Sequence, residues 1–135
     1  VMSLGSWDPA AESAAYHLQI EPATLDRFIS YSRDDQLEQL EQLIDGDEAQ
    51  ILAGLMLIEH EAWLEAVQAR PDEDLVHLIR FFAVAENLPG WEAGNRSPVI
   101  PLAKVLRTRG ARLDKPFLQW LRQVSNNRFL PYGPL

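Results

Sequence analysis

The residues best suited to binding chemistry lie in the segment 89–97, PGWEAGNRS, and in the stretch that follows it. A helix start is predicted at Pro98, and free backbone N–H groups and the helix dipole favour a carboxylate or a phosphate at such a position. Loops also carry binding residues more often than the elements that they join. We therefore predict a partner- or anion-binding site at the following loop residues: Trp91, Asn95, Arg96 and Ser97.

A purely structural interpretation of the same loop stays open. In that interpretation Trp91 packs onto the core, Arg96 pairs with an acid such as Glu92, and Ser97 only caps the helix. The prolines of the sequence SPVIP remove two backbone donors from the helix start, and the chain has no Walker-type or dinucleotide-binding fingerprint.

The helix predicted over 98–109 carries basic residues on its outer side. At helical spacing, Lys104 and Arg107 face away from the buried stripe, which consists of Val99, Leu102, Ala103 and Leu106. Lys104 and Arg107 are therefore added to the predicted contact surface.

Catalytic and metal-binding patterns are weak. Asp74 and His77 have the i, i+3 spacing of carboxylate-bridged metal sites, but such sites need a second pair, and Glu59, His60 and Glu61 do not repeat the spacing. The sequence contains no nucleophile elbow, zincin helix or kinase motif. We predict no catalytic residue, no metal site and no cofactor.

The charge is divided very unevenly along the chain. Residues 1–95 hold nineteen acidic and four basic side chains, whereas residues 96–135 hold one acid, Asp114, and eight basic groups, which together make the net charge of −8. The basic third either docks on the acidic part of the same chain or faces outward toward an acidic partner or nucleic acid. The negative net charge opposes binding of a polyanion, so nucleic acid is the less favoured partner.

Composition excludes several classes of protein. The chain has 135 residues, 47% of them hydrophobic, which fits one domain with a real core. It has no cysteine, so a disulfide-stapled secreted scaffold is excluded. No stretch approaches a membrane span and no signal-peptide pattern is visible, so we expect a cytoplasmic protein without membrane contact.

Helix start and stop signals organise the chain. Alanine-rich residues predict a short helix over 9–18, and amphipathic patterns predict two helices that begin at Pro22 and near Asp34, the second ended by Gly46 as a left-handed C-cap. Residues 48–70 are predicted as one long helix, and its apolar first half makes it the central helix. Three further helices are predicted: 72–88, 98–109 and one that starts at Asp114 and Pro116.

The C-terminal sequence RFLPYGPL contains four large apolar residues. We expect it to pack back across the helices, with a docking peptide for a partner as the alternative.

These patterns predict an all-α fold: a single compact domain of six or seven helices packed as antiparallel helical hairpins around a central apolar helix. The domain spans 1–135, with 1–8 and 129–135 as candidates for extended termini.

The predicted function is that of a non-enzymatic helical interaction or adaptor protein, which binds a protein partner through the 91–97 loop and the following basic helix. Two alternatives remain open: a nucleic-acid-associated regulator that uses the C-terminal basic residues, and a small-anion-binding protein or enzyme with a pocket under the 89–97 loop. The sequence leaves the oligomeric state open.

Overall fold

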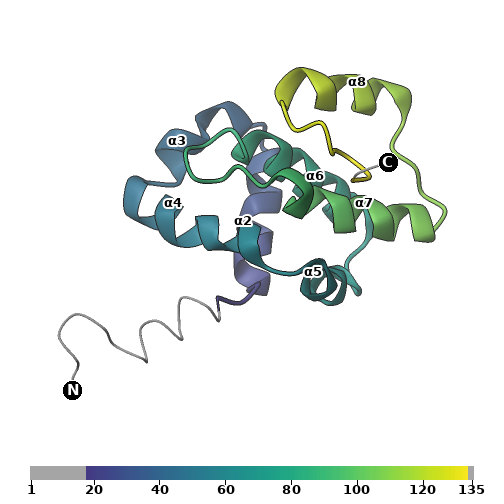
Figure 1. Cartoon of the computed structure of the whole chain (residues 1–135), viewed down its shortest axis with the longest axis horizontal. Coiled ribbons are helices and arrows are strands. Elements are labelled where there is room, and N and C mark those ends of the chain that lie inside the picture. Colours follow the sequence, from purple (N-terminus) through teal and green to yellow (C-terminus); the bar gives the residue numbers. More distant parts are fainter. Residues whose placement is uncertain (1–17, 134–135) are drawn as a thin grey trace.

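The computed structural model describes residues 18–133, which form an all-helical, single compact domain (Figure 1). The described part contains seven α-helices: α2 (Pro22–Arg33), α3 (Leu40–Leu43), α4 (Gly46–Leu52), α5 (His60–Val67), α6 (Asp72–Ala85), α7 (Val99–Thr108) and α8 (Lys115–Val124). Three 3-10 helices join them: η1 (Leu37–Gln39), η2 (Ala53–Leu57) and η3 (Gly94–Arg96). The predicted fold class is confirmed. The helix predicted over 9–18 lies almost entirely outside the described residues.

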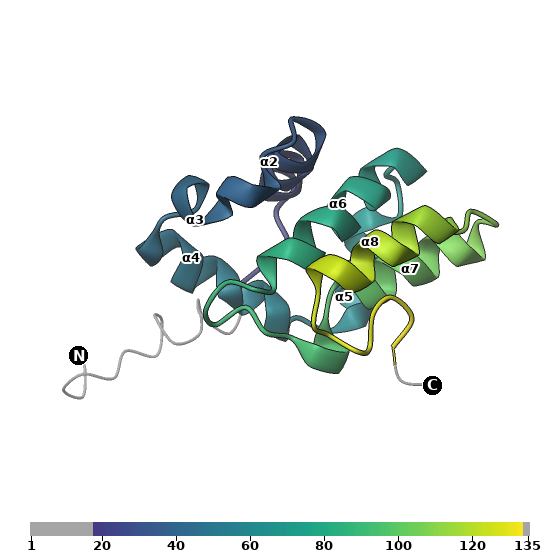
Figure 2. The same cartoon turned by 90° about the horizontal axis from the view of Figure 1, so that it is seen from above.

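The central helix is α6, which contacts α2, α7 and α8 on different sides. Figure 2 shows α8 running alongside α6 and α7, between them in this view, with α2 on the other side of α6. Helical spacing predicts an apolar stripe on α6, and all of its members are buried: Leu75, Leu78, Ile79, Phe82 and Ala85. Phe81 and Ala83, outside that stripe, are buried as well. A helix that is apolar on more than one face needs neighbours on more than one face, which explains why α6 occupies the centre.

An aromatic cluster joins α6 to its neighbours. The Phe28 ring of α2 stacks on Phe81 with 3.9 Å between the ring centroids. Trp63 of α5 meets Phe82 edge-on at 5.2 Å. Both contacts are of the kind that aromatic rings prefer in protein cores, and all four side chains are fully buried.

The prediction of one central helix over 48–70 is wrong. The segment is broken into α4, η2 and α5, with extended backbone at Ile58 and Glu59. Ile51 and Leu57 are 65% and 68% exposed, so the apolar run is not surrounded on all sides. The carbonyl oxygen of Leu57 at the break accepts a hydrogen bond from the Arg96 guanidinium, which satisfies a group that a continuous helix would have used internally.

Gly46 also differs from its prediction as a helix C-cap. It is the first residue of α4, and the side chain of Asp45 before it accepts a hydrogen bond from the backbone N–H of Glu48 at 3.0 Å. The helix start signal of Asp45 therefore prevails over the stop signal of the glycine, since an N-cap aspartate satisfies a free backbone donor.

The last third of the described chain follows the prediction closely. All residues of the predicted stripe of α7 are buried, Pro101 is buried as well, and Gly110 ends the region with a φ of +83°. The Asp114 side chain caps α8 by accepting a hydrogen bond from the N–H of Phe117 at 2.9 Å. Leu130 and Tyr132 pack against the core, so the packed tail is confirmed as far as Gly133. Among the helices in the described range, none is long and apolar enough to cross a membrane.

Candidate functional site

Two of the predicted site residues are buried. Trp91 is fully buried, donates a hydrogen bond from Nε1 to the carbonyl oxygen of Ala49 at 3.1 Å, and meets Phe81 edge-on. Ser97 is also fully buried, and its Oγ accepts a hydrogen bond from the N–H of Val99 at 3.2 Å. Both side chains hold the 89–97 loop onto the core, as the structural interpretation of the loop expects.

Asn95 and Arg96 are exposed, but Arg96 is already engaged. Its guanidinium donates to the Leu57 carbonyl oxygen at 2.6 Å and makes no ion pair with Glu92. The two residues line a shallow pocket of about 330 Å³ that also includes Glu59. The acid beside Arg96 weakens this pocket as a place for a second negative charge.

Lys104 and Arg107 are exposed on α7, as predicted, but they face different neighbours. Lys104 lines a groove with α5, whereas the Arg107 guanidinium lies 4.7 Å from the centre of the Tyr132 ring in the C-terminal tail. The structure therefore does not join the six predicted residues in one surface. It brings Arg107 together with the tail.

Most basic side chains of the acidic part of the chain are used inside the fold. Arg27 donates two hydrogen bonds to the Glu48 carboxylate, at 2.5 and 2.7 Å, and thereby lowers the pKa of Glu48. Arg70 pairs with Asp26 at 2.8 Å, and Arg80 donates to the Ser32 hydroxyl at 3.1 Å. These contacts tie α2 to α4 and to α6.

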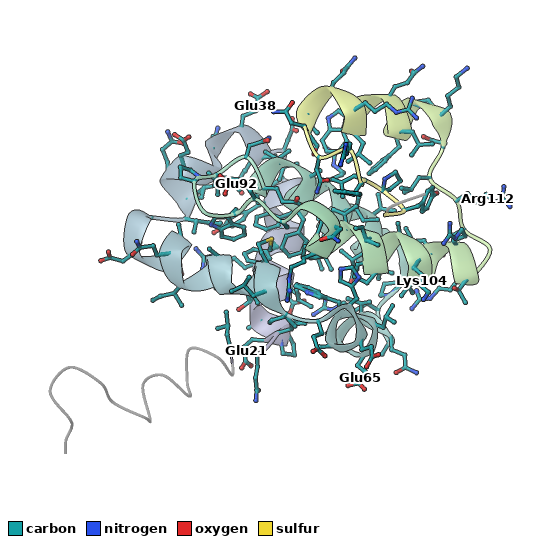
Figure 3. The ribbon with its side chains drawn as sticks, in the orientation of Figure 1. Glu21, Glu38, Glu65, Glu92, Lys104 and Arg112 are labelled. Atoms are coloured by element: carbon teal, nitrogen blue, oxygen red, sulfur yellow. The ribbon has the colours of Figure 1, made fainter. Side chains whose placement is uncertain are left out.

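The basic side chains of the last third are used differently. Within 18–133, Arg109 alone among them pairs with an acid, Asp72, at 2.9 Å. Six others are exposed and form no ion pair with any described residue: Lys104, Arg107, Arg112, Lys115, Arg122 and Arg128. Figure 3 shows Lys104 and Arg112 toward one end of the molecule and Glu38 and Glu92 toward the other. The excess of basic charge therefore faces outward and is not neutralised by docking on the acidic part of the described chain.

The first of two grooves runs between α8 and the C-terminal tail. It has a volume of about 370 Å³, and its lining includes Arg122, Arg128 and Tyr132 together with Leu118 and Pro131. None of the described residues that line it is acidic. We call it the arginine groove. Because the Arg107 guanidinium lies over the Tyr132 ring, three guanidinium groups border one partly apolar surface.

The second groove lies on the other side of the segment 125–128. Its volume is about 540 Å³, and its charged lining residues are Glu86, Glu92 and Arg128. We call it the carboxylate groove. Glu86 is only 6% exposed; its carboxyl accepts hydrogen bonds from Ser97 Oγ at 2.5 Å and from Asn127 Nδ2 at 3.1 Å. Burial raises the pKa of Glu86 to about 7, and the two hydrogen bonds offset part of that effect.

Sequence reasoning missed Arg122, Arg128 and Glu86 as site residues. Helical spacing places Arg122 on the polar face of α8, where an arginine is ordinary, and Arg128 precedes a tail whose course the sequence does not define. Glu86 lies at the end of the α6 stripe, one residue after Ala85, so its position resembles that of an ordinary exposed acid. The sequence feature that pointed to these residues was the apolar C-terminal tail, because a tail that packs back on the helices forms grooves beside them.

Fold and grooves together define an all-helical domain with two binding-sized surfaces of opposite charge. No family model, curated protein or solved structure matches this chain. Within residues 18–133, no three histidine, cysteine, aspartate or glutamate side chains converge as ligands for a metal ion.

Proposed function

We propose that this protein is a non-enzymatic interaction domain that binds an acidic segment of a protein partner. The contact surface is the arginine groove, extended by the exposed basic residues of α7 and α8. The observation that carries the proposal is that a partly apolar groove has arginines and no acid in its lining. This surface replaces the 91–97 loop as the centre of the contact, because Trp91 and Ser97 have no exposed side chain to offer.

The chemistry of the groove favours a carboxylate beside an apolar side chain. Arg122 and Arg128 can each donate two parallel hydrogen bonds to a carboxylate, and an arginine fork matches that group geometrically. Leu118, Pro131 and the Tyr132 ring provide an apolar floor between them. Arginine and tyrosine are also the residues in which binding energy is most often concentrated at protein interfaces.

A protein partner is favoured over nucleic acid for two reasons. The chain as a whole has a net charge of −8, which repels an extended polyanion at long range but affects a short acidic segment less. The aromatic rings beside the basic residues are partly buried: Trp120 and Tyr132 each have one arginine over the ring, so they are poor platforms for stacked bases.

The test is a fluorescence-anisotropy titration with a labelled peptide in which glutamates alternate with leucines. We expect saturable binding that Arg122→Glu weakens by about tenfold or more, because a charged hydrogen-bonding partner is replaced by a repelling group. Arg33→Glu is the matched control: Arg33 is an exposed arginine at the end of α2, outside both grooves, and its reversal changes the net charge equally.

Labelled single- and double-stranded oligonucleotides form the second arm of the experiment. Phosphate contacts release counterions and weaken steeply with salt, whereas a contact with an apolar floor keeps most of its affinity. Tight oligonucleotide binding that Arg122→Glu abolishes would replace the proposed partner with nucleic acid. Absence of peptide binding, or equal losses in Arg122→Glu and Arg33→Glu, would contradict the proposal.

A further inference from the structure

The carboxylate groove has a property that the arginine groove lacks: a buried charge-bearing group without a countercharge. Glu86 forms no ion pair with any residue in the range 18–133, and both of its hydrogen bonds come from neutral donors, Ser97 and Asn127. A buried carboxylate without a cation nearby is costly, so its ionised form gains strongly from any positive charge that enters the groove.

The remaining lining of the groove also accepts hydrogen bonds. Asn87 also lines the groove, and its Nδ2 donates a hydrogen bond to the carbonyl oxygen of Val124 at 2.8 Å, so its side-chain oxygen is the group that can accept a further hydrogen bond. Glu92 contributes a second, exposed carboxylate. An ammonium group has three donors and needs several acceptors around it, and the groove offers acceptors from three side chains.

One cation already lines the groove, and its position decides whether it could serve as the missing countercharge. Arg128 is exposed, and its guanidinium lies 5.1 Å from the centre of the Phe129 ring. It forms neither a hydrogen bond nor an ion pair with Glu86 among the described contacts. Arg128 therefore lines the groove without forming an ion pair with Glu86.

We propose that the carboxylate groove binds a primary aliphatic ammonium group, with Glu86 as its countercharge and with Glu92 and the Asn87 side-chain oxygen as further acceptors. The groove volume of about 540 Å³ is in the range of small-ligand sites. The same ammonium chemistry occurs in a free diamine and in a lysine side chain of a partner. This site is independent of the proposed function, because a different groove and different residues form it.

The experiment is a titration of the isotopically labelled full chain with 1,4-diaminobutane, followed by NMR through the side-chain amide of Asn127 and the backbone amides near Gly94. We expect saturable shifts at these groups and none with 1,4-butanediol, which has the same length and no charge. A short peptide with one lysine forms a parallel arm. Tighter binding of the diamine assigns the site to a free amine, and tighter binding of the peptide assigns it to a lysine of a partner.

Two variants and one control separate the site from general attraction to an acidic protein. Glu86→Gln should weaken binding by about tenfold or more, since a charged hydrogen bond is lost, and Glu92→Gln should weaken it less. Glu38→Gln removes one exposed carboxylate, as Glu92→Gln does, but at a residue that lines neither groove, and it should leave binding unchanged.

Circular dichroism tests whether Glu86→Gln keeps its fold. If it does not, the comparison of Glu92→Gln with Glu38→Gln tests the site instead. The proposal is overturned if neither amine causes saturable shifts at Asn127. It is also overturned if Glu92→Gln and Glu38→Gln weaken binding equally, because the attraction would then be unspecific.

Discussion

The arginine groove and the carboxylate groove share one wall, the segment 125–128, and differ in how their charges are held. Arg122 and Arg128 are exposed and face water, so their charges need no partner in the fold. Glu86 is buried and depends on Ser97 and Asn127 for its hydrogen bonds. We therefore expect the exposed arginine charges to affect binding far more than the free energy of folding, whereas we expect the buried carboxyl of Glu86 to affect both.

The largest expected effect comes from the pH dependence of Glu86. Its pKa of about 7 in the folded chain exceeds the ordinary value of 4.5, so between these pH values the folded chain keeps a proton that the unfolded chain has released. The stability of the wild type should therefore fall as the pH rises through this window, by about 3 kcal/mol in total, and level off above it.

Urea denaturation at several pH values, with wild type and Glu86→Gln, measures this contribution. The glutamine variant should lack it, because an amide does not titrate in this range. The other charged groups that line the groove, Glu92 and Arg128, are unchanged in both proteins, so they cancel in the difference. If the free energies of unfolding of the two proteins depend on pH in the same way, the Glu86 carboxyl is hydrated in solution. Glu86 would then not differ from the exposed arginines in its effect on folding.

Removal of the tail after Asn127 should have the next largest effect. The truncation deletes Leu130 and Tyr132, which pack against the core, and should lower the free energy of unfolding by about 2 kcal/mol. Thermal unfolding measures the loss, and full-length Arg128→Ala separates lost packing from lost charge. An unchanged melting temperature would show that the tail is not part of the folded domain.

Asn127→Ala tests the shared wall itself. Asn127 donates to Glu86 and to the carbonyl oxygen of Gly94 at 2.8 Å, and its side-chain oxygen accepts from the N–H of Phe129 at 3.0 Å. Loss of these bonds should destabilise the chain by about 1.5 kcal/mol and weaken binding at both grooves. The neighbouring Asn126 is exposed, so Asn126→Ala serves as the control. If chemical denaturation gives equal values for the two variants, Asn127 does not hold the wall in place.

The smallest expected effect is that of Arg107→Ala. The stacking of its guanidinium on Tyr132 should contribute about 0.5 kcal/mol, as is typical of exposed cation–π contacts. Lys104→Ala, on the same helix without such a contact among the described residues, should change stability even less. A loss of several times that size in Arg107→Ala would mean that the arginine groove also depends on its charges for folding.

Helix boundaries were predicted best where local signals agree. At α7 and α8, the apolar spacing, the Asp114 cap and Gly110 all indicate the same ends, and the structure follows them. The prediction for 48–70 was wrong because the apolar spacing fits one helix, whereas the carbonyl freed at the break accepts a hydrogen bond from Arg96, a residue distant in the sequence. Within this segment, a Cβ at Gly54 would lie only 3.0 Å from the Leu18 side chain, which is another contact that local spacing does not reveal.

The predicted site residues also show that local sequence patterns predict exposure and burial better than contacts between distant segments. The exposure of Lys104 and Arg107 followed from helical spacing alone, because α7 has one clearly apolar side. The burial of Trp91 was foreseen as one of two interpretations, but its hydrogen bond to Ala49 joins segments that no local pattern connects.

By itself, the sequence determined the helical class, the buried stripes of α6 and α7 and the division of charge along the chain, since composition and periodicity act over a few residues at a time. Only the tertiary structure decided that the basic excess faces outward, that Glu86 is buried without a countercharge and that two grooves of opposite charge share one wall. Those properties depend on how the tail after α8 packs back on the helices, and the packing free energy that directs it is a sum over contacts between distant residues.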